Sequence, residues 1–305
     1  MKPIAALHGW KLKAFLGLAG VLARLGIGAM SSKAMSMPAE KRASVVPAPW
    51  MLLPMPETGI ERSTVAGRSG AIPVKRFIPR NRKSAATPIL FLHGGGWIAG
   101  GVDSLDYLCT HLCDRLGTEV TAVGYRLAPE HPFPAALEDC EDALEALLAN
   151  APLVDVVGDS AGGNLTAALA LRWRRRTAIR RQVIIYPFLD LCMGSPSLKP
   201  SRHGMTWEGA ELIIAKYRGT TAANDPLVSP LHAPDLSGLP PAIIVTADAD
   251  PLRDDGSRYA ERLREAGVPV RYENYMGMPH AFLSIPSLCP AAPLCIDMLV
   301  EAMQQ

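Results

Sequence analysis

A serine stands at the centre of a short glycine-bounded motif that is typical of a nucleophile. The motif is Gly158-Asp159-Ser160-Ala161-Gly162, and it directly follows the apolar run 154–157. A serine on a sharp turn between a strand and a helix needs small neighbours, because larger side chains would clash there. The run of small residues that follows is expected to be that helix, with its first amides beside the serine. We therefore predict that Ser160 is a nucleophile.

A serine is a weak nucleophile at neutral pH, so it needs a base, a group that orients the base, and donors for the oxygen that becomes charged. His280 is the best candidate for the base, because it lies between a predicted strand, 270–275, and the last predicted helix. This position gives the order serine, acid, histidine along the chain. The other histidines fall in the N-terminal segment, the glycine loop, a helix, a proline-rich loop or an irregular stretch: His8, His93, His111, His131, His203 and His232.

Four aspartates follow the predicted strand 242–246 and compete for the role of the acid. Asp254 and Asp255 open a helix, where a favourable interaction with the helix dipole explains them. Asp248 and Asp250 lie in the loop itself, and the spacing alone leaves both of them open.

A run of three glycines follows another predicted strand, in the motif His93-Gly94-Gly95-Gly96-Trp97. Consecutive glycines allow the backbone to turn its N–H groups toward a substrate oxygen. We predict that the amides of Gly94, Gly95 and Ala161 form an oxyanion hole. A phosphate-binding loop is the alternative, but no lysine followed by serine or threonine completes that pattern.

Apolar runs of strand length alternate with segments of helical spacing along the chain. Strands are predicted over 72–77, 89–93, 120–125, 154–157, 183–186, 242–246 and 270–275. Helices are predicted over 103–116, capped by Asp103 or Ser104, and over 135–149, 161–173, 206–217, 253–266 and 290–303. This alternation favours a mostly parallel sheet with helices on both faces, whose sites form at the carboxyl ends of the strands.

Composition excludes several classes of protein. The 305 residues are 49% hydrophobic and 20% charged, which excludes wholesale disorder. With 31 basic and 29 acidic residues, the net charge of +2 gives no electrostatic case for nucleic-acid binding. The six cysteines form neither a disulfide framework nor a zinc motif, so we predict no metal and expect reduced thiols in a cytoplasmic protein.

The N-terminal region contains one apolar stretch, residues 14–23, with Lys13 before it and Arg24 after it. Ten residues are too few to span a bilayer. A helix packed on the protein, or making peripheral contact with a membrane surface, is the favoured interpretation. The alternative is a signal peptide that exports the protein and is removed.

Four motifs in this order resemble those of the hormone-sensitive-lipase-like esterases, bacterial family IV of the α/β-hydrolase superfamily. They are the glycine loop 93–97, the run 125–135, the serine motif extended to 158–164, and the segment 250–256. The resemblance covers roughly residues 70–290 and implies that Asp250, before Pro-Leu-Arg, is the catalytic acid. Ala281 is a departure, because the family usually has glycine after the catalytic histidine.

The resemblance also implies an architecture, an α/β-hydrolase fold with a helical cap. We expect residues 1–58 to form an N-terminal cap segment and linker, and residues 59–305 to form the catalytic domain with a cap insertion at about 188–225. Many relatives are homodimers, so a homodimer is an expectation here. Trp97, Phe188 and Phe282 are expected to contribute to the substrate pocket.

The activity that follows is hydrolysis of short-to-medium acyl esters, small molecules, through a Ser-His-Asp triad and an acyl-enzyme, without a cofactor. An amidase or arylacetamide-type deacetylase with the same triad is one alternative. A non-catalytic ligand-binding protein is another, but the plant receptors of that kind lose the histidine that this chain keeps as His280.

Overall fold

The computed structural model describes residues 37–83, 86–198 and 207–305. In them, eight strands form one sheet in the order β1-β2-β4-β3-β5-β6-β7-β8. The strands are β1 (Gly59–Gly67), β2 (Gly70–Ile78), β3 (Ile89–Leu92), β4 (Val120–Val123), β5 (Val154–Asp159), β6 (Ile179–Ile185), β7 (Ala242–Ala249) and β8 (Val270–Pro279). The pairs β1–β2 and β2–β4 are antiparallel and all other pairs are parallel.

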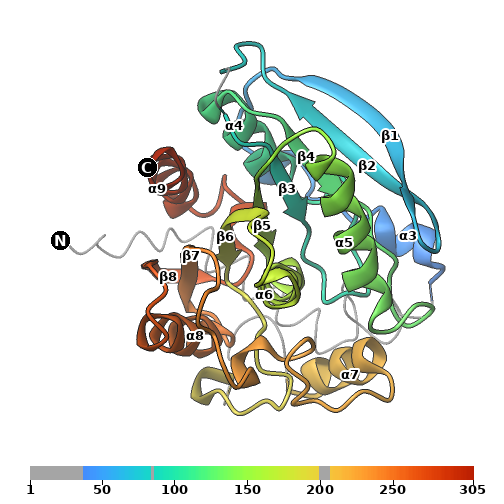
Figure 1. Ribbon diagram of the computed structural model, residues 1–305. Helices are drawn as coiled ribbons and strands as arrows, with labels where there is room; N and C mark the ends of the chain where they lie inside the picture. The colour runs from blue at the N-terminus through green and yellow to red at the C-terminus, as the bar shows by residue number, and fades with distance from the viewer. Residues whose placement is uncertain (1–36, 84–85, 199–206) are drawn as a thin grey trace.

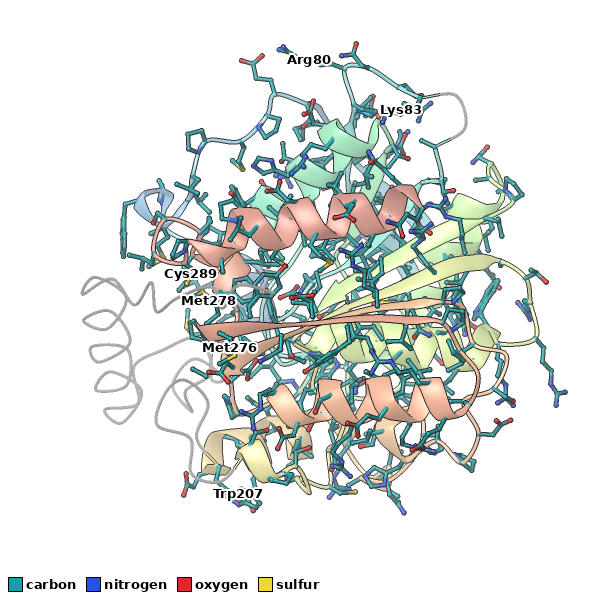
Figure 2. The ribbon with its side chains drawn as sticks, turned by 90° about the vertical axis from the view of Figure 1, so that its left-hand side faces the viewer. Arg80, Lys83, Trp207, Met276, Met278 and Cys289 are labelled. Carbon is teal, nitrogen blue, oxygen red and sulfur yellow. The ribbon has the colours of Figure 1, made fainter. Side chains whose placement is uncertain are left out.

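Helices cover both faces of this sheet (Figure 1). The α-helices are α3 (Ala39–Ala43), α4 (Asp106–Leu116), α5 (Ala135–Leu148), α6 (Ala161–Trp173), α7 (Trp207–Arg218), α8 (Arg253–Glu265) and α9 (Ala291–Gln304). The buried residues of α5, α6 and α8 pack in the core on one face, and those of α4 and α9 pack in the core on the other. Figure 2 shows α8 and α9 on opposite sides of the sheet. The predicted α/β architecture is confirmed.

The central strands are buried on both faces, which explains why they read as continuous apolar runs. Every residue of β3, β4 and β5 is buried. The edge hairpin is different, because β1 is mostly exposed and polar. Because β1 has no clear pattern of apolar residues, the sequence predicted only β2 of this hairpin as a strand.

Several predicted boundaries differ from the structure, among them the ends of β7 and β8, which extend to Ala249 and Pro279. Charge pairing explains two others. Helix α4 begins at Asp106 without a side-chain cap, because Asp103 and Asp106 each accept a hydrogen bond from Lys75 Nζ, both at 2.6 Å. Strand β6 begins at Ile179 rather than at residue 183, although two arginines follow Ile179. The buried carboxylate of Asp155 in β5 pairs with both of them, so their charges are tolerated in the strand.

The predicted cap insertion contains one described α-helix, α7, which lies beyond the carboxyl ends of the strands in Figure 1. Tyr217 of α7 stacks on Trp97 with ring centroids 4.0 Å apart. The backbone N–H of Phe133 donates to the Tyr217 carbonyl at 2.7 Å. Helix α7 therefore packs directly against the glycine loop.

The predicted N-terminal apolar helix lies outside the described residues. The described part of the N-terminal segment includes α3 and the 3-10 helix η1 (Pro49–Met51). Across the described ranges, no helix has the length and apolar character needed to cross a membrane.

We predict that Gly162→Ala destabilises the fold far more than Gly163→Ala. A Cβ at residue 162 would overlap the backbone carbonyl of Leu92, whereas one at residue 163 would approach the Pro187 side chain at 3.0 Å. Both changes introduce the same methyl group into the first turn of α6, so the second is a matched control. We expect the first to cost about 3 kcal/mol or more of unfolding free energy, measured by urea denaturation. Equal losses would show that α6 is free to move away from β3.

Candidate active site

Ser160 occupies the turn between β5 and α6, in a backbone conformation that L-residues rarely adopt. Its φ is 54° and its ψ is −115°. The turn is possible because Gly158 and Gly162 approach so closely that a Cβ on Gly158 would overlap the Gly162 carbonyl. The Ser160 N–H donates to the Ile185 carbonyl at 2.8 Å, which ties the turn to β6. The predicted strand–turn–helix context of this serine is confirmed.

The structure brings the three predicted catalytic side chains together in one chain of contacts. Ser160 Oγ lies 2.9 Å from His280 Nε2. His280 Nδ1 lies 2.7 Å from Asp250 Oδ2, so its N–H donates to the carboxylate. The other carboxylate oxygen accepts the backbone N–H of Leu252 at 2.8 Å. Asp250 is therefore fixed by its own loop and in turn orients the imidazole.

The two aspartates that the spacing left open differ in what they contact. The Asp250 side chain is completely buried against His280. Asp248 is one-third exposed, lies 3.6 Å from Arg253, and accepts the Gly277 N–H at 3.3 Å. The geometry therefore favours Asp250 as the partner of the histidine, as the resemblance implies.

Opposing effects set the pKa of His280. Burial lowers the pKa, but the negative charge of Asp250 and the hydrogen bond to it raise it, and the charge of Asp159 adds to the rise. The net pKa of His280 is raised above its ordinary value of 6.5. A base whose cation is stabilised in this way is suited to accepting a proton from a serine.

The amide of Gly94 does not point to a free oxyanion hole, so that part of the prediction is wrong. Its N–H donates to Asp159 Oδ1 at 2.7 Å. Asp159 is fully buried, and burial raises its pKa to about 6 even though the Gly94 N–H stabilises the charged form. The carboxylate of Asp159 therefore holds the glycine loop beside the serine turn.

The next two glycines have the conformations that an oxyanion loop needs. Gly95 and Gly96 have φ values of 113° and 62°, and a Cβ on Gly95 would overlap the Ala99 carbonyl. Within the described ranges, no hydrogen bond from the N–H of Gly95 or Gly96 is present. Ala161 is the first residue of α6, so its N–H has no acceptor within the helix. These three amides are therefore left as candidate donors for an oxyanion.

His93 is a structural residue of the same loop. Its ring is buried and stacks on Tyr125 with centroids 4.0 Å apart, and Nδ1 lies 2.7 Å from the Gly94 carbonyl. Burial lowers the pKa of His93 to about 4, so the ring stays neutral. The Tyr125 hydroxyl donates to the His93 carbonyl at 2.6 Å, which anchors the end of β3.

The three aromatic residues predicted to shape the pocket are all buried within the protein. Trp97 is 0% exposed between Tyr217 and Phe188, and Phe188 is 3% exposed. Phe282 is also 0% exposed and packs on Tyr186. All three therefore have packing roles, and a contact between any of them and substrate stays a prediction.

Several residues that support the site carried no signal in the sequence. Arg42 is 1% exposed, and its guanidinium donates to the Ile98 carbonyl at 2.8 Å and to the Ala128 carbonyl at 3.3 Å. It also pairs with Glu130. The ring of Tyr186 makes an edge contact with His280, with centroids 5.1 Å apart. The N-terminal segment thus helps to fix the glycine loop, although no motif marks it.

Asp255 also differs from its prediction as a helix-dipole residue. It is 1% exposed, and Oδ2 accepts the backbone N–H groups of Leu189 and Asp190 at 2.7 and 2.8 Å. Burial raises the pKa of Asp255 to about 7 despite these hydrogen bonds. This carboxyl joins the start of α8 to the loop that follows β6.

We predict that Asp250→Asn lowers the pKa of His280 and that Asp248→Asn leaves it nearly unchanged. The first change removes the charge that opposes burial, and the second removes a charge that pairs elsewhere. NMR titration of the imidazole carbons measures both. A fall of equal size in the two variants would contradict the assignment of Asp250 as the partner.

Comparisons with known proteins show which family the chain is similar to. A family model described as the alpha/beta hydrolase fold matches residues 89–284. The chain is 38% identical over 249 residues to an ethyl acetate hydrolase of Pseudomonas putida, covering 77% of this chain and 78% of that one. It is 36% identical over 245 residues to an arylesterase of Saccharolobus solfataricus, covering 75% and 79% of the two chains.

A solved esterase of the archaeon Pyrobaculum calidifontis superposes with a TM-score of 0.81 at 30% identity, over 99% of this chain and 98% of the other. The carboxylic ester hydrolase LipN of Mycobacterium tuberculosis is 35% identical over 260 residues, covering 79% of this chain and 69% of LipN. The chain therefore belongs to the α/β-hydrolase family, as a carboxylic ester hydrolase of the hormone-sensitive-lipase-like branch.

Proposed function

We propose that this protein hydrolyses short-to-medium acyl esters of small molecules, with Ser160 as the nucleophile, His280 as the general base and Asp250 as the residue that orients the base. The observation that carries the proposal is the continuous contact from Ser160 Oγ through both ring nitrogens of His280 to Asp250. An imidazole held at both nitrogens is fixed in the tautomer that accepts the serine proton.

The reaction proceeds in two steps. Ser160 Oγ attacks the ester carbonyl carbon while its proton moves to His280 Nε2, and the carbonyl oxygen becomes an oxyanion. His280 then gives that proton to the leaving alcohol, which leaves an acyl group on the serine. A water molecule, deprotonated by the same nitrogen, attacks the acyl-enzyme, and the carboxylic acid is released as His280 returns that proton to Ser160 Oγ.

We infer that the N–H groups of Gly95, Gly96 and Ala161 stabilise the oxyanion. The amide of Gly94 is excluded because it already donates to Asp159. Preorganised donors of this kind lower the barrier because they need no reorientation as the negative charge develops. Asp159 is then a positioning residue, which acts on substrate only through the glycine loop.

Two relatives are named for the esters that they act on, ethyl acetate and aryl esters. These names support a preference for small esters. We expect the rate for p-nitrophenyl esters to be highest with acetyl to hexanoyl groups and to fall with longer chains. A series of acyl lengths measured at kcat/KM tests this preference. A maximum at palmitoyl would contradict it, without affecting the assignment of the triad.

The nucleophile is tested with Ser160→Ala, which should fold normally and lose ester hydrolysis by on the order of 10⁴-fold or more. Ser257→Ala, a change of the same type in α8, is the matched control and should keep full activity.

Matched ester and anilide substrates, measured in parallel, separate an esterase from an amidase. The rate of the parent protein should also rise with pH through a pKa above 6.5, because neutral His280 is the active base. A Ser160→Ala rate within tenfold of the parent would exclude this mechanism.

A further inference from the structure

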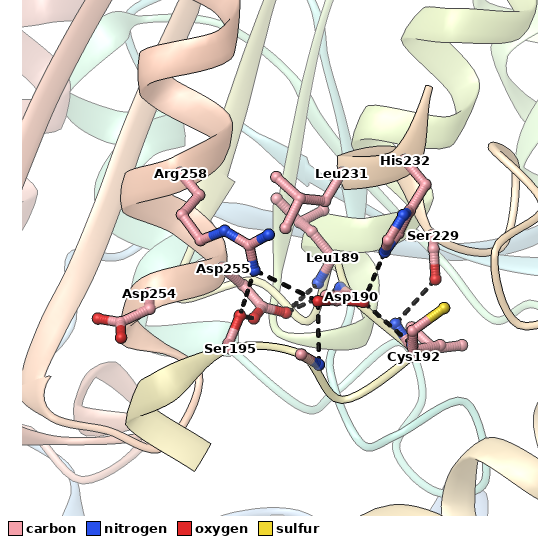
Figure 3. Close-up of polar contacts among 12 residues, drawn as sticks. Leu189, Asp190, Cys192, Ser195, Ser229, Leu231, His232, Asp254, Asp255 and Arg258 are labelled. Carbon is pink, nitrogen blue, oxygen red and sulfur yellow. Dashed lines mark hydrogen bonds and ion pairs between the residues drawn. The ribbon is translucent and has the colours of Figure 1, made fainter. Parts of the chain in front are cut away.

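A second group of reactive side chains lies outside the catalytic site, in the loop that follows β6. Asp190, Cys192 and His232 each offer one potential metal-binding atom, and these atoms all lie within 4.8 Å of one another. Figure 3 shows the three side chains, two from the loop after β6 and one from the 3-10 helix η3 (Pro230–His232). Nothing in the proposed ester hydrolysis uses them.

The carboxylate of Asp190 is held in place from several sides. It is 1% exposed, and Oδ2 accepts the Gly194 N–H at 3.1 Å and lies 3.3 Å from Arg258 Nη1. Its other oxygen, Oδ1, accepts the Cys192 N–H at 3.1 Å and lies 2.8 Å from His232 Nε2. Both oxygens are thus held by backbone N–H groups, and Oδ1 also contacts the histidine.

The two chain segments that supply these side chains are tied to each other. The Leu191 N–H donates to Ser229 Oγ at 2.8 Å, and the Leu231 N–H donates to the Leu189 carbonyl at 3.2 Å. The buried carboxyl of Asp255 anchors the same loop to α8 through Leu189 and Asp190. The separation between the potential ligands is therefore set by the backbone before any ion binds.

The donor set is chemically selective. A thiolate, an imidazole and a carboxylate are the three ligand types that zinc binds in proteins, usually with tetrahedral geometry. Cys192 is exposed, whereas the other five cysteines are buried, so an ion can reach this thiol from solvent. Among the described residues, Cys192 also has a histidine and a carboxylate beside it.

We propose that Asp190, Cys192 and His232 bind a Zn²⁺ ion, with water in the fourth position. Binding replaces the hydrogen bond between Asp190 Oδ1 and His232 Nε2 with two bonds to the metal. The Cys192 thiol releases its proton to solvent, and the His232 ring carries its hydrogen on Nδ1 instead of Nε2, so that Nε2 is free to bind the ion. Asp190 Oδ2 keeps its contact with Arg258, so the carboxylate binds the ion through one oxygen. The proposal is independent of the ester hydrolysis.

The sequence did not predict this site, because zinc motifs are recognised by close pairs of cysteines and histidines. Here two ligands are two residues apart and the third lies 42 residues from Asp190. The fold alone places them together.

The test uses the full chain after treatment with a chelator, titrated with Co²⁺ as a spectroscopic substitute for Zn²⁺. We expect a thiolate-to-cobalt charge-transfer band in the near ultraviolet, which added Zn²⁺ removes by displacing the cobalt. Cys192→Ser should abolish the band. His232→Gln should weaken Zn²⁺ binding at least about tenfold, the loss caused even by changes outside the ligand shell. His131→Gln, a change of the same type at an exposed histidine in another loop, should have no effect.

Thiol reactivity provides a second readout that does not depend on cobalt. A thiol reagent should modify Cys192 in the chelator-treated protein, and Zn²⁺ should slow that modification. Circular dichroism in the presence of chelator shows whether each variant is folded. Absence of the charge-transfer band in the parent protein, its survival in Cys192→Ser, or equal thiol reactivity with and without Zn²⁺ would each overturn the proposal.

Discussion

The hydrogen bond between Asp159 and Gly94 connects the serine turn to the glycine loop, the two parts of the site that must keep a fixed position relative to each other. Asp159 is the last residue of β5 and directly precedes the serine, and Gly94 lies in the glycine loop after β3. Because β3 and β5 are neighbours in the parallel sheet, their carboxyl ends meet at this bond. Ser160 adopts a backbone conformation that costs on the order of 1–3 kcal/mol, so its surroundings must determine it strongly. The glycines, the contact with Ile185 and this buried bond together do so.

Two largely buried histidines near the site differ in pKa because their charged neighbours differ. His93 is buried without a charged partner, and burial lowers its pKa to about 4, so it remains a neutral support for the loop. His280 is also largely buried, but Asp250 and Asp159 stabilise its cation, and its pKa is raised. The difference in pKa therefore arises from the neighbouring carboxylates. It makes the first histidine a packing residue and gives the second the properties of a base.

Local pattern was sufficient to predict the buried strands, the larger helices and the serine turn, because buried parallel strands are continuous apolar runs and the turn requires glycines at fixed spacing. It missed β1, which is mostly exposed. It was also sufficient to select His280 from seven histidines. It was not sufficient to choose between Asp248 and Asp250, which the resemblance decided and the contact with His280 supports. The Gly94 assignment was wrong because the acceptor of its N–H lies 65 residues away, and no spacing rule connects the two. Arg42 and Asp255 were missed for the same reason, since their roles depend on loops that meet only in the folded chain.

The most direct test of the proposed site is a crystal structure of the protein after reaction with an alkyl phosphonate ester. The account predicts a covalent bond from phosphorus to Ser160 Oγ, with the phosphoryl oxygen about 3 Å from the N–H groups of Gly95, Gly96 and Ala161. The Gly94 N–H should still donate to Asp159 in that adduct. A phosphoryl oxygen bound by Gly94, with the Asp159 contact broken, would contradict the account of the oxyanion hole. An adduct on any residue other than Ser160 would contradict its central claim.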